Sequence, residues 1–153
     1  MIVFRLAKEK YSHDLSGNGA FKTGGRWNSK ATAMVYTSDS RALCTAEIAV
    51  HTPLGLLPSD YEIISIEIPD SIKIKTLAKN KLPYDWNSIP HPESTQEIGD
   101  EFIKQNKSVV LKVPSAVVQG DFNYLLNPKH SDFRKIKIRK VETFSFDYRL
   151  FLK

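Results

Sequence analysis

The order of apolar and polar positions along the chain predicts mainly short strands. Runs rich in branched and aromatic residues, bounded by Gly, Pro, Asp or Asn, are typical of strands. Such runs cover residues 2–6, 33–37, 61–68, 72–77 and 109–113. A last strand or hairpin is expected within residues 133–151, where Ile136 and Ile138 alternate with basic residues as in a half-buried strand. Residues 10–22 contain two glycines and are expected to form a loop.

Two segments have the apolar spacing of helices. The first is expected over residues 38–51, with Ser38 and Ser40 as N-cap candidates. Its apolar stripe consists of Leu43, Ala46 and Val50. The second is expected to run from a capping box at residues 94–97 to about Asn106. Because helices and strands do not alternate regularly, the pattern favours an α+β fold over a doubly wound parallel sheet.

The composition is that of a folded protein with one core. A chain of 153 residues fits a single domain over residues 1–153, and 41% hydrophobic with 25% charged residues are ordinary values. The one cysteine, Cys44, cannot form an internal disulfide. The start of the chain does not resemble a signal peptide, and charged residues or Pro interrupt each apolar run. We therefore expect a cytoplasmic protein that does not enter a membrane.

The formal net charge is +5, and basic residues gather between Lys129 and Lys140. Such a cluster can mark a nucleic-acid surface. The alternation of basic and apolar residues there favours the solvated face of a half-buried strand instead. The positive field can still attract an anionic dinucleotide or an acidic partner protein.

Several familiar motifs are missing from the sequence. Gly17-Asn-Gly-Ala20 contains a Gly-x-Gly fragment, but it lacks the preceding strand and following helix of a dinucleotide fingerprint. There is no Walker A motif, and the four histidines do not have metal-ligand spacing. We therefore predict neither a P-loop nor a metal site.

One arginine, one tyrosine and one glutamate follow each other within a short span. Arg26 comes after two glycines, Tyr36 lies in a predicted strand, and Glu47 lies in the first predicted helix. A planar cation, an aromatic face and a carboxylate can together hold phosphates, a flat base and a sugar. Glu47 also has mainly apolar neighbours, so its carboxylate needs a partner or a purpose. NAD is a molecule that contains phosphates, a flat base and a sugar, so it is a ligand of the kind that these three side chains can hold.

These residues lie within motifs that resemble those of the RES domain. The motifs are Gly-x-Gly-Ala at 17–20, Gly-Gly-Arg-Trp-Asn at 24–28, Val-Tyr-Thr-Ser at 35–38, Ala-Glu-x-x-Val-His at 46–51, Val-Pro-Ser at 113–115 and Asn-Tyr-Leu-Leu-Asn-Pro at 123–128. The resemblance covers almost the whole chain, with the motifs in the family's order. It implies a fold similar to ADP-ribosyltransferases of the diphtheria-toxin kind. It also implies a type II toxin that consumes NAD or transfers its ADP-ribose, paired with an Xre-like antitoxin.

The resemblance assigns Arg26, Glu47 and Ser115 to the residues that give the domain its name, with Tyr36 as their aromatic companion. These four are the predicted catalytic residues, and Arg26, Tyr36, Ser115 and Asn28 are the predicted substrate contacts. NAD would be the substrate, without a metal. The sequence departs from the pattern at Ala31, where a glycine is common. If that backbone has a positive φ, alanine costs stability or shifts the loop.

The proposed chemistry gives each side chain a task. Cleavage between ribose and nicotinamide creates an oxocarbenium-like centre, which the carboxylate of Glu47 can stabilise. The fork of Arg26 can hold phosphate, and Tyr36 can form a wall for nicotinamide. Ser115 can donate to phosphate or to the nicotinamide amide. Each residue also has a structural interpretation: Arg26 in a surface ion pair, Tyr36 in the core, Glu47 on a solvated helix face.

Two functional classes remain. The first is an enzyme that cleaves NAD by phosphorolysis, by hydrolysis or by transfer of ADP-ribose to a protein, and that an antitoxin inhibits. DNA would then be contacted only through the antitoxin, and a homodimer is compatible with this interpretation. The second is a catalytically inactive binding module of the same fold, such as a nucleic-acid or protein adaptor. Release of nicotinamide from NAD discriminates between them.

Overall fold

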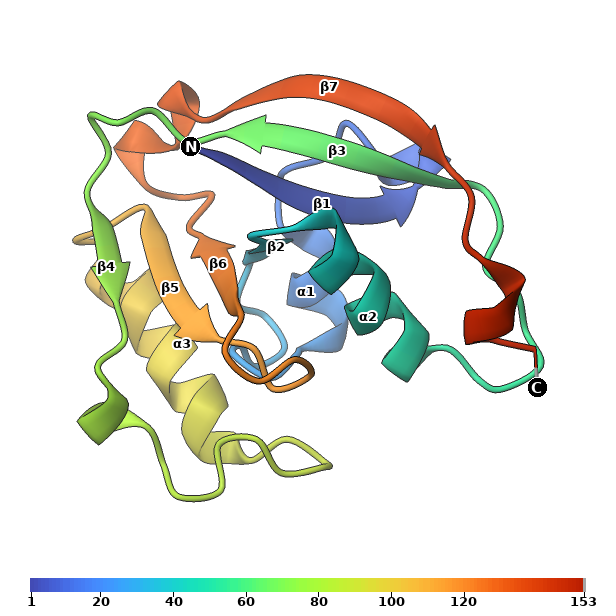
Figure 1. Cartoon of the computed structure of the whole chain (residues 1–153). Helices are drawn as coiled ribbons and strands as arrows, with labels where there is room; N and C mark the ends of the chain where they lie inside the picture. Colours follow the sequence, from blue (N-terminus) through green and yellow to red (C-terminus); the bar gives the residue numbers. More distant parts are fainter. Residues whose placement is uncertain (153) are drawn as a thin grey trace.

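The computed structural model describes residues 1–152 and shows an α+β fold around a mixed seven-stranded sheet (Figure 1). In spatial order the strands are β4 (Ile74–Thr76), β5 (Val110–Pro114), β6 (Phe122–Leu126), β2 (Val35–Ser38), β1 (Ile2–Lys8), β3 (Tyr61–Glu67) and β7 (Lys137–Phe144). β4 and β5 are parallel, and the other neighbours are antiparallel. The expected α+β class is confirmed.

Three α-helices connect or cover these strands. They are α1 (Asn18–Thr23), α2 (Arg41–His51) and α3 (Glu93–Gln105). Short 3-10 helices occur at Glu9–Tyr11, Lys79–Lys81, Ser131–Lys135 and Tyr148–Leu150. α3 lies behind β5, and α2 follows β2 and lies against β1 (Figure 1). Within residues 1–152, no helix has the length and apolar character needed to cross a bilayer.

The sheet consists of two halves that are joined by very little strand pairing. β4, β5, β6 and β2 form a four-stranded half, and β1, β3 and β7 form a three-stranded half. β1 pairs with β3 along its whole length, whereas the register between β1 and β2 contains the single pair Phe4 and Ser38. The seam between the halves therefore depends on side-chain packing more than on the strand ladder.

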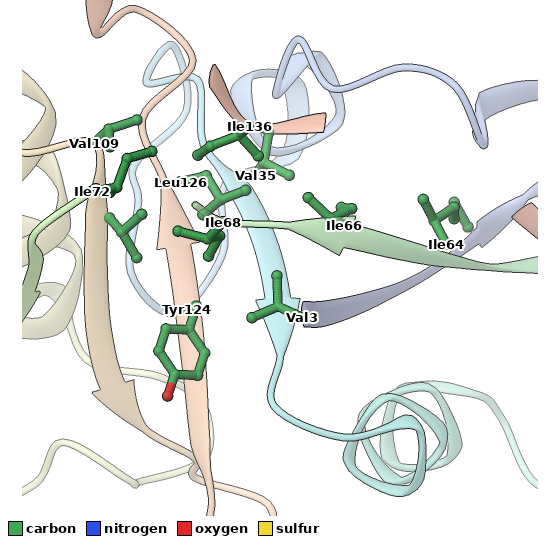
Figure 2. Close-up of a cluster of buried hydrophobic side chains, with 12 residues drawn as sticks. Val3, Val35, Ile64, Ile66, Ile68, Ile72, Val109, Tyr124, Leu126 and Ile136 are labelled. Atoms are coloured by element: carbon green, nitrogen blue, oxygen red, sulfur yellow. The ribbon is translucent and has the colours of Figure 1, made fainter. Parts of the chain in front are cut away.

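Two apolar clusters form the core. The first lies across both halves, where Val3, Ile64 and Ile66 of the three-stranded half meet Val35, Tyr124 and Leu126 of the four-stranded half (Figure 2). The second contains Trp27, Met34, Phe102, Ile103, Leu111, Val113 and Leu125. Because successive side chains of a strand alternate, Tyr124 and Leu126 face the first cluster and Leu125 faces the second. The second cluster thus lies on the opposite face, beneath α3.

The predicted first helix is confirmed, but its stripe is partly wrong. Ser40 is the N-cap, and its hydroxyl accepts a 3.0 Å hydrogen bond from the backbone N–H of Leu43. Leu43 and Cys44 are buried, whereas Val50 is 59% exposed. The first turns of α2 carry its buried residues, so an apolar residue in the last turn remains in contact with solvent.

The second helix begins differently from the prediction. α3 has Pro92 as N-cap without a side-chain cap, and Ser94 lies inside the first turn. The capping box is therefore wrong, and the buried hydroxyl of Ser94 has no hydrogen-bond partner within residues 1–152. The predicted end is confirmed, because Asn106 adopts the left-handed conformation with φ of 50°. The segment 10–22, predicted as a loop, contains most of α1.

The strand predicted in the basic segment near the C-terminus is confirmed only in part, because residues 131–135 form a 3-10 helix and the strand with the solvated face is β7. β7 pairs with β3, and Arg139 forms a surface ion pair with Glu67. The register shifts between Ser65 and Ile66, so Arg139 is an extra residue opposite them. This bulge allows Ile138 and Val141 to pack against the same first cluster, although strict alternation would place them on opposite faces.

Candidate active site

Polar side chains from three neighbouring strands meet at one end of the four-stranded half. Tyr36 and Ser38 belong to β2, Asn123 belongs to β6, and Ser115 directly follows β5. Asn123 is the register partner of Ser38, and also of Val113 in β5. By alternation, these side chains lie on the face of the second cluster. The helix α2 starts three residues after Ser38, which brings Glu47 to the same place.

Glu47 is fixed by two hydrogen bonds to the same carboxylate oxygen. Its Oε1 accepts from Nδ2 of Asn123 at 2.9 Å and from Oγ of Ser115 at 3.3 Å. The structure thus brings together Glu47 and Ser115, which the sequence assigned to one site. It adds Asn123, which lies 76 residues from Glu47 along the chain. The resemblance included Asn123 in a motif, but no local pattern assigned it a role.

The hydroxyl of Ser115 is committed to the protein. The side chain is 3% exposed, and its Oγ accepts hydrogen bonds of 3.1 Å from the backbone N–H groups of Val117 and Val118. Its only hydrogen is directed to Glu47. Ser115 is therefore placed to orient Glu47, and this arrangement does not support the predicted direct bond to phosphate or nicotinamide.

The hydroxyl of Tyr36 is also occupied. It donates to Oδ1 of Asn28 at 2.7 Å and accepts from the backbone N–H of Trp27 at 3.0 Å. Burial raises the pKa of Tyr36 well above its ordinary value, so the hydroxyl remains protonated. A Cβ atom at Gly25 would lie 2.8 Å from this hydroxyl, which explains a glycine there. The ring of Tyr36 is the part that remains for a ligand.

Asn28 holds the loop that carries Arg26. Its side chain is completely buried, and the two hydrogens of Nδ2 are shared among three carbonyl oxygens. These belong to Ala20, Ser29 and Thr32. Because no part of Asn28 is exposed, the predicted contact with substrate is not supported by this structure. The observed bonds make Asn28 a structural support for the loop of Arg26.

Arg26 is oriented by a loop that comes before α3. Its Nη1 donates to the carbonyl oxygens of Trp86 at 2.8 Å and Ser88 at 3.0 Å. From α3, Gln96 donates to the carbonyl oxygens of Gly25 and Asn28 and so fixes the backbone on both sides of Arg26. Burial lowers the pKa of Arg26 and the nearby charge of Glu47 opposes this shift, but a guanidinium remains charged.

The two charges of the site do not neutralise each other directly. Among residues 1–152, no ion pair within 4.0 Å joins Arg26 to Glu47. The same part of the chain contains no group of three or more side chains suited to holding a metal ion. The site therefore contains a cation and a carboxylate that are held separately, by different partners.

Ala31 has the backbone conformation that its position in the pattern suggested. Its φ is 71°, in the left-handed region that favours glycine. Its backbone N–H donates to the carbonyl oxygen of Phe21 at 2.8 Å, so the loop keeps this conformation in spite of the side chain. Of the two expected effects of alanine, a shifted loop and a loss of stability, the structure therefore favours a loss of stability through backbone strain.

Comparison with solved structures identifies the class of fold. A chain of the crystal structure of the M. tuberculosis MbcT–MbcA toxin–antitoxin complex superposes with a TM-score of 0.76. The match covers 94% of the present chain and 84% of that chain, at 20% sequence identity. The α+β architecture with its mixed sheet is thus that of a chain in a toxin–antitoxin complex.

Sequence comparison then gives the family. The family model for the RES domain matches residues 2–149, and the chain belongs to this family. It is 39% identical over 152 residues to Toxin Res of Photorhabdus laumondii, covering 98% of the chain and 97% of that protein. It is 36% identical over 149 residues to the Prs ADP-ribosylating toxin of a Sphingobium species, covering 96% and 92%.

Proposed function

We propose that this protein is the toxin of a toxin–antitoxin system and that it breaks the bond between nicotinamide and ribose in NAD. The observation that carries the proposal is the fixed carboxylate of Glu47, whose charge acts on the separately held guanidinium of Arg26. The biological role is supported by relatives that are named toxins and that the chain matches over nearly their full length. A relative named as ADP-ribosylating supports the chemistry.

Glu47 acts at the sugar. When the bond between the ribose carbon and the nicotinamide nitrogen breaks, its electron pair leaves with nicotinamide and positive charge develops on the ribose. A fixed carboxylate stabilises that charge more strongly than water does, because it needs no reorientation. It can also accept a hydrogen bond from a ribose hydroxyl. Phosphate, water or a protein side chain then takes the place of nicotinamide.

Arg26 and Tyr36 hold the groups of NAD on either side of the reacting ribose, which are the pyrophosphate and the nicotinamide. Nη1 of Arg26 contacts protein carbonyl groups, so the rest of its fork can bind the pyrophosphate. The ring of Tyr36, whose hydroxyl is fixed, supplies a flat surface for nicotinamide. Ser115 and Asn28 orient Glu47 and the Arg26 loop respectively.

An enzyme that consumes NAD harms the cell in which it is made, so we propose a cytoplasmic antitoxin that covers the site. The family resemblance assigns this role to an Xre-like, DNA-binding protein. Such a partner excludes NAD by covering the ligand surface or by placing a charged group against Arg26 or Glu47. Expression of the chain in bacteria should stop growth and lower cellular NAD. Co-expression of the neighbouring small open reading frame should restore both.

The direct test is release of nicotinamide by the purified protein. NAD is incubated with the protein alone, with inorganic phosphate and with a cell extract as source of protein acceptors, and the products are separated by chromatography. Glu47→Gln keeps the size of the side chain but removes its charge, so we expect turnover to fall about 100-fold or more. Glu97→Gln, at an exposed position of α3, is the matched control and should keep normal turnover.

Two results would contradict the proposal. Wild-type protein that releases no nicotinamide under any of the three conditions would indicate the inactive binding module. Near-normal turnover by a folded Glu47→Gln protein would exclude the mechanism, even if NAD is consumed.

A further inference from the structure

Asn123 of β6 joins the carboxylate of Glu47 to Ser38 of the neighbouring strand β2. Its Nδ2 donates to Oε1 of Glu47 at 2.9 Å, and its Oδ1 accepts from the hydroxyl of Ser38 at 2.9 Å. Ser38 is 5% exposed and is the register partner of Asn123 across β2 and β6. A continuous chain of hydrogen bonds thus runs from β2 through β6 to α2.

The chemistry of these groups determines the direction of the chain. An ionised carboxylate accepts hydrogen bonds and cannot donate them, so the atom of Asn123 that faces Glu47 must be the amide nitrogen. The amide oxygen then faces Ser38, and only the hydroxyl of Ser38 can supply the hydrogen between the two oxygens. Ser38 therefore fixes the amide in the one orientation that is able to hold Glu47.

The two oxygens of the carboxylate have different surroundings. Asn123 and Ser115 both donate to Oε1. Within residues 1–152, Oε2 has no hydrogen-bond partner, and it is not among the buried polar atoms that lack one. It is consequently not completely buried. The network fixes one oxygen and leaves the other free to contact a ligand.

We infer that Asn123, held by Ser38, is a positioning residue that directs Oε2 of Glu47 toward the reacting ribose. The inference rests on the proposed function and adds two residues to the machinery. Neither needs to contact NAD, because both act through Glu47. The main effect of losing Asn123 should therefore be on the chemical step, with little effect on the affinity for NAD.

Asn123→Ala should lower kcat about 10- to 100-fold, because a carboxylate misplaced by about 1 Å loses most of its effect. The dissociation constant for NAD, measured by calorimetry, should change less than about twofold. Asn123→Asp has almost the same shape but presents a second carboxylate to Glu47, so it should be at least as harmful. A residue that only fills space would tolerate Asp better than Ala. The matched control is Asn127→Ala, a buried asparagine at the other end of β6 that donates to Asn106; it should keep normal kcat.

A double variant tests whether Asn123 acts through Glu47. In the Glu47→Gln background, Asn123→Ala should cause no further loss of kcat, since its target has already been changed. Independent, multiplying losses would overturn the inference, and so would normal kcat in a folded Asn123→Ala protein.

Thermal unfolding gives a readout that does not depend on catalysis. Combining Asn123→Asp with Glu47→Gln exchanges donor and acceptor, so the double variant should be more stable than the sum of the two single changes predicts. Additive losses would overturn the inference. If the wild-type protein does not cleave NAD, the proposed function fails. The unfolding measurement still shows whether Asn123 and Glu47 interact.

Discussion

The two halves of the sheet use their polar side chains in opposite ways. In the four-stranded half, Ser38 and Asn123 face inward and bond to other side chains, ending at Glu47. In the three-stranded half, charged residues point into solvent and form surface ion pairs, such as that between Arg139 and Glu67. Buried hydrogen bonds fix geometry, whereas exposed ion pairs contribute little to stability. Accurate side-chain geometry is therefore required in the four-stranded half and not in the three-stranded half.

The largest effect on stability is expected where α3 packs against the four-stranded half. A Cβ atom at Gly99 would lie 1.6 Å from the backbone oxygen of Trp27, which cannot move without shifting Arg26 as well. Gly99→Ala should therefore lower the free energy of unfolding by about 3 kcal/mol, although alanine favours helices. Denaturant unfolding measures this loss.

The control for this change is Gly19→Ala in α1, where an added Cβ meets no atom within 4 Å. It should raise the free energy of unfolding by about 0.5–1 kcal/mol. Equal effects at Gly19 and Gly99 would contradict the close packing of α3.

The next effect concerns ligand binding in the same half. Arg26→Lys keeps the charge but loses the planar fork, so NAD should bind about 10-fold more weakly. Arg26→Ala should weaken it further. Calorimetry on folded variants measures both. Unchanged affinity in the two proteins would remove Arg26 from the site.

A smaller effect should come from relieving backbone strain near the site. Ala31→Gly replaces an L-residue at φ of 71°, so it should raise the free energy of unfolding by about 1 kcal/mol. The same substitution at Ala42, an exposed position in α2, should lower it by about 0.5–1 kcal/mol. Opposite signs in thermal unfolding would confirm the strain, and a loss at both positions would disprove it.

The smallest effect is expected in the three-stranded half. Arg139→Ala removes an exposed ion pair and should change the free energy of unfolding by no more than about 0.5 kcal/mol. Turnover of NAD should also stay normal. A clear loss of turnover would mean that the basic strand takes part in function and that the two halves are less distinct than the structure indicates.

The sequence predicted those elements whose pattern is local. β1, β3 and α2 stand out because alternation, helical spacing and the Ser40 cap are all visible in short windows. β6 is harder to recognise, since Tyr124, Leu125 and Leu126 are buried on both faces and do not alternate with polar residues. The bulge at β7 is equally hidden, because it depends on the pairing with β3.

The site shows the same division. Arg26, Tyr36 and Glu47 were assigned to a site because cation, aromatic ring and carboxylate suggested a ligand and because the family pattern contains them. Ser38 and Asn123 also lie in motifs of the family pattern, but nothing in the sequence assigns them a role, since that role follows from a strand register that joins residues 85 positions apart. The burial of Asn28 was equally unpredictable, because it depends on how three separate carbonyl groups fold around its amide.

The two carbonyl groups that hold Arg26 also have a consequence for the entropy of binding. A free arginine side chain loses about 1.5–2 kcal/mol of conformational freedom when it is immobilised. In this protein the contacts with Trp86 and Ser88 impose much of that loss during folding, before any ligand arrives. An anion that meets the guanidinium therefore keeps more of the favourable energy of the contact as affinity.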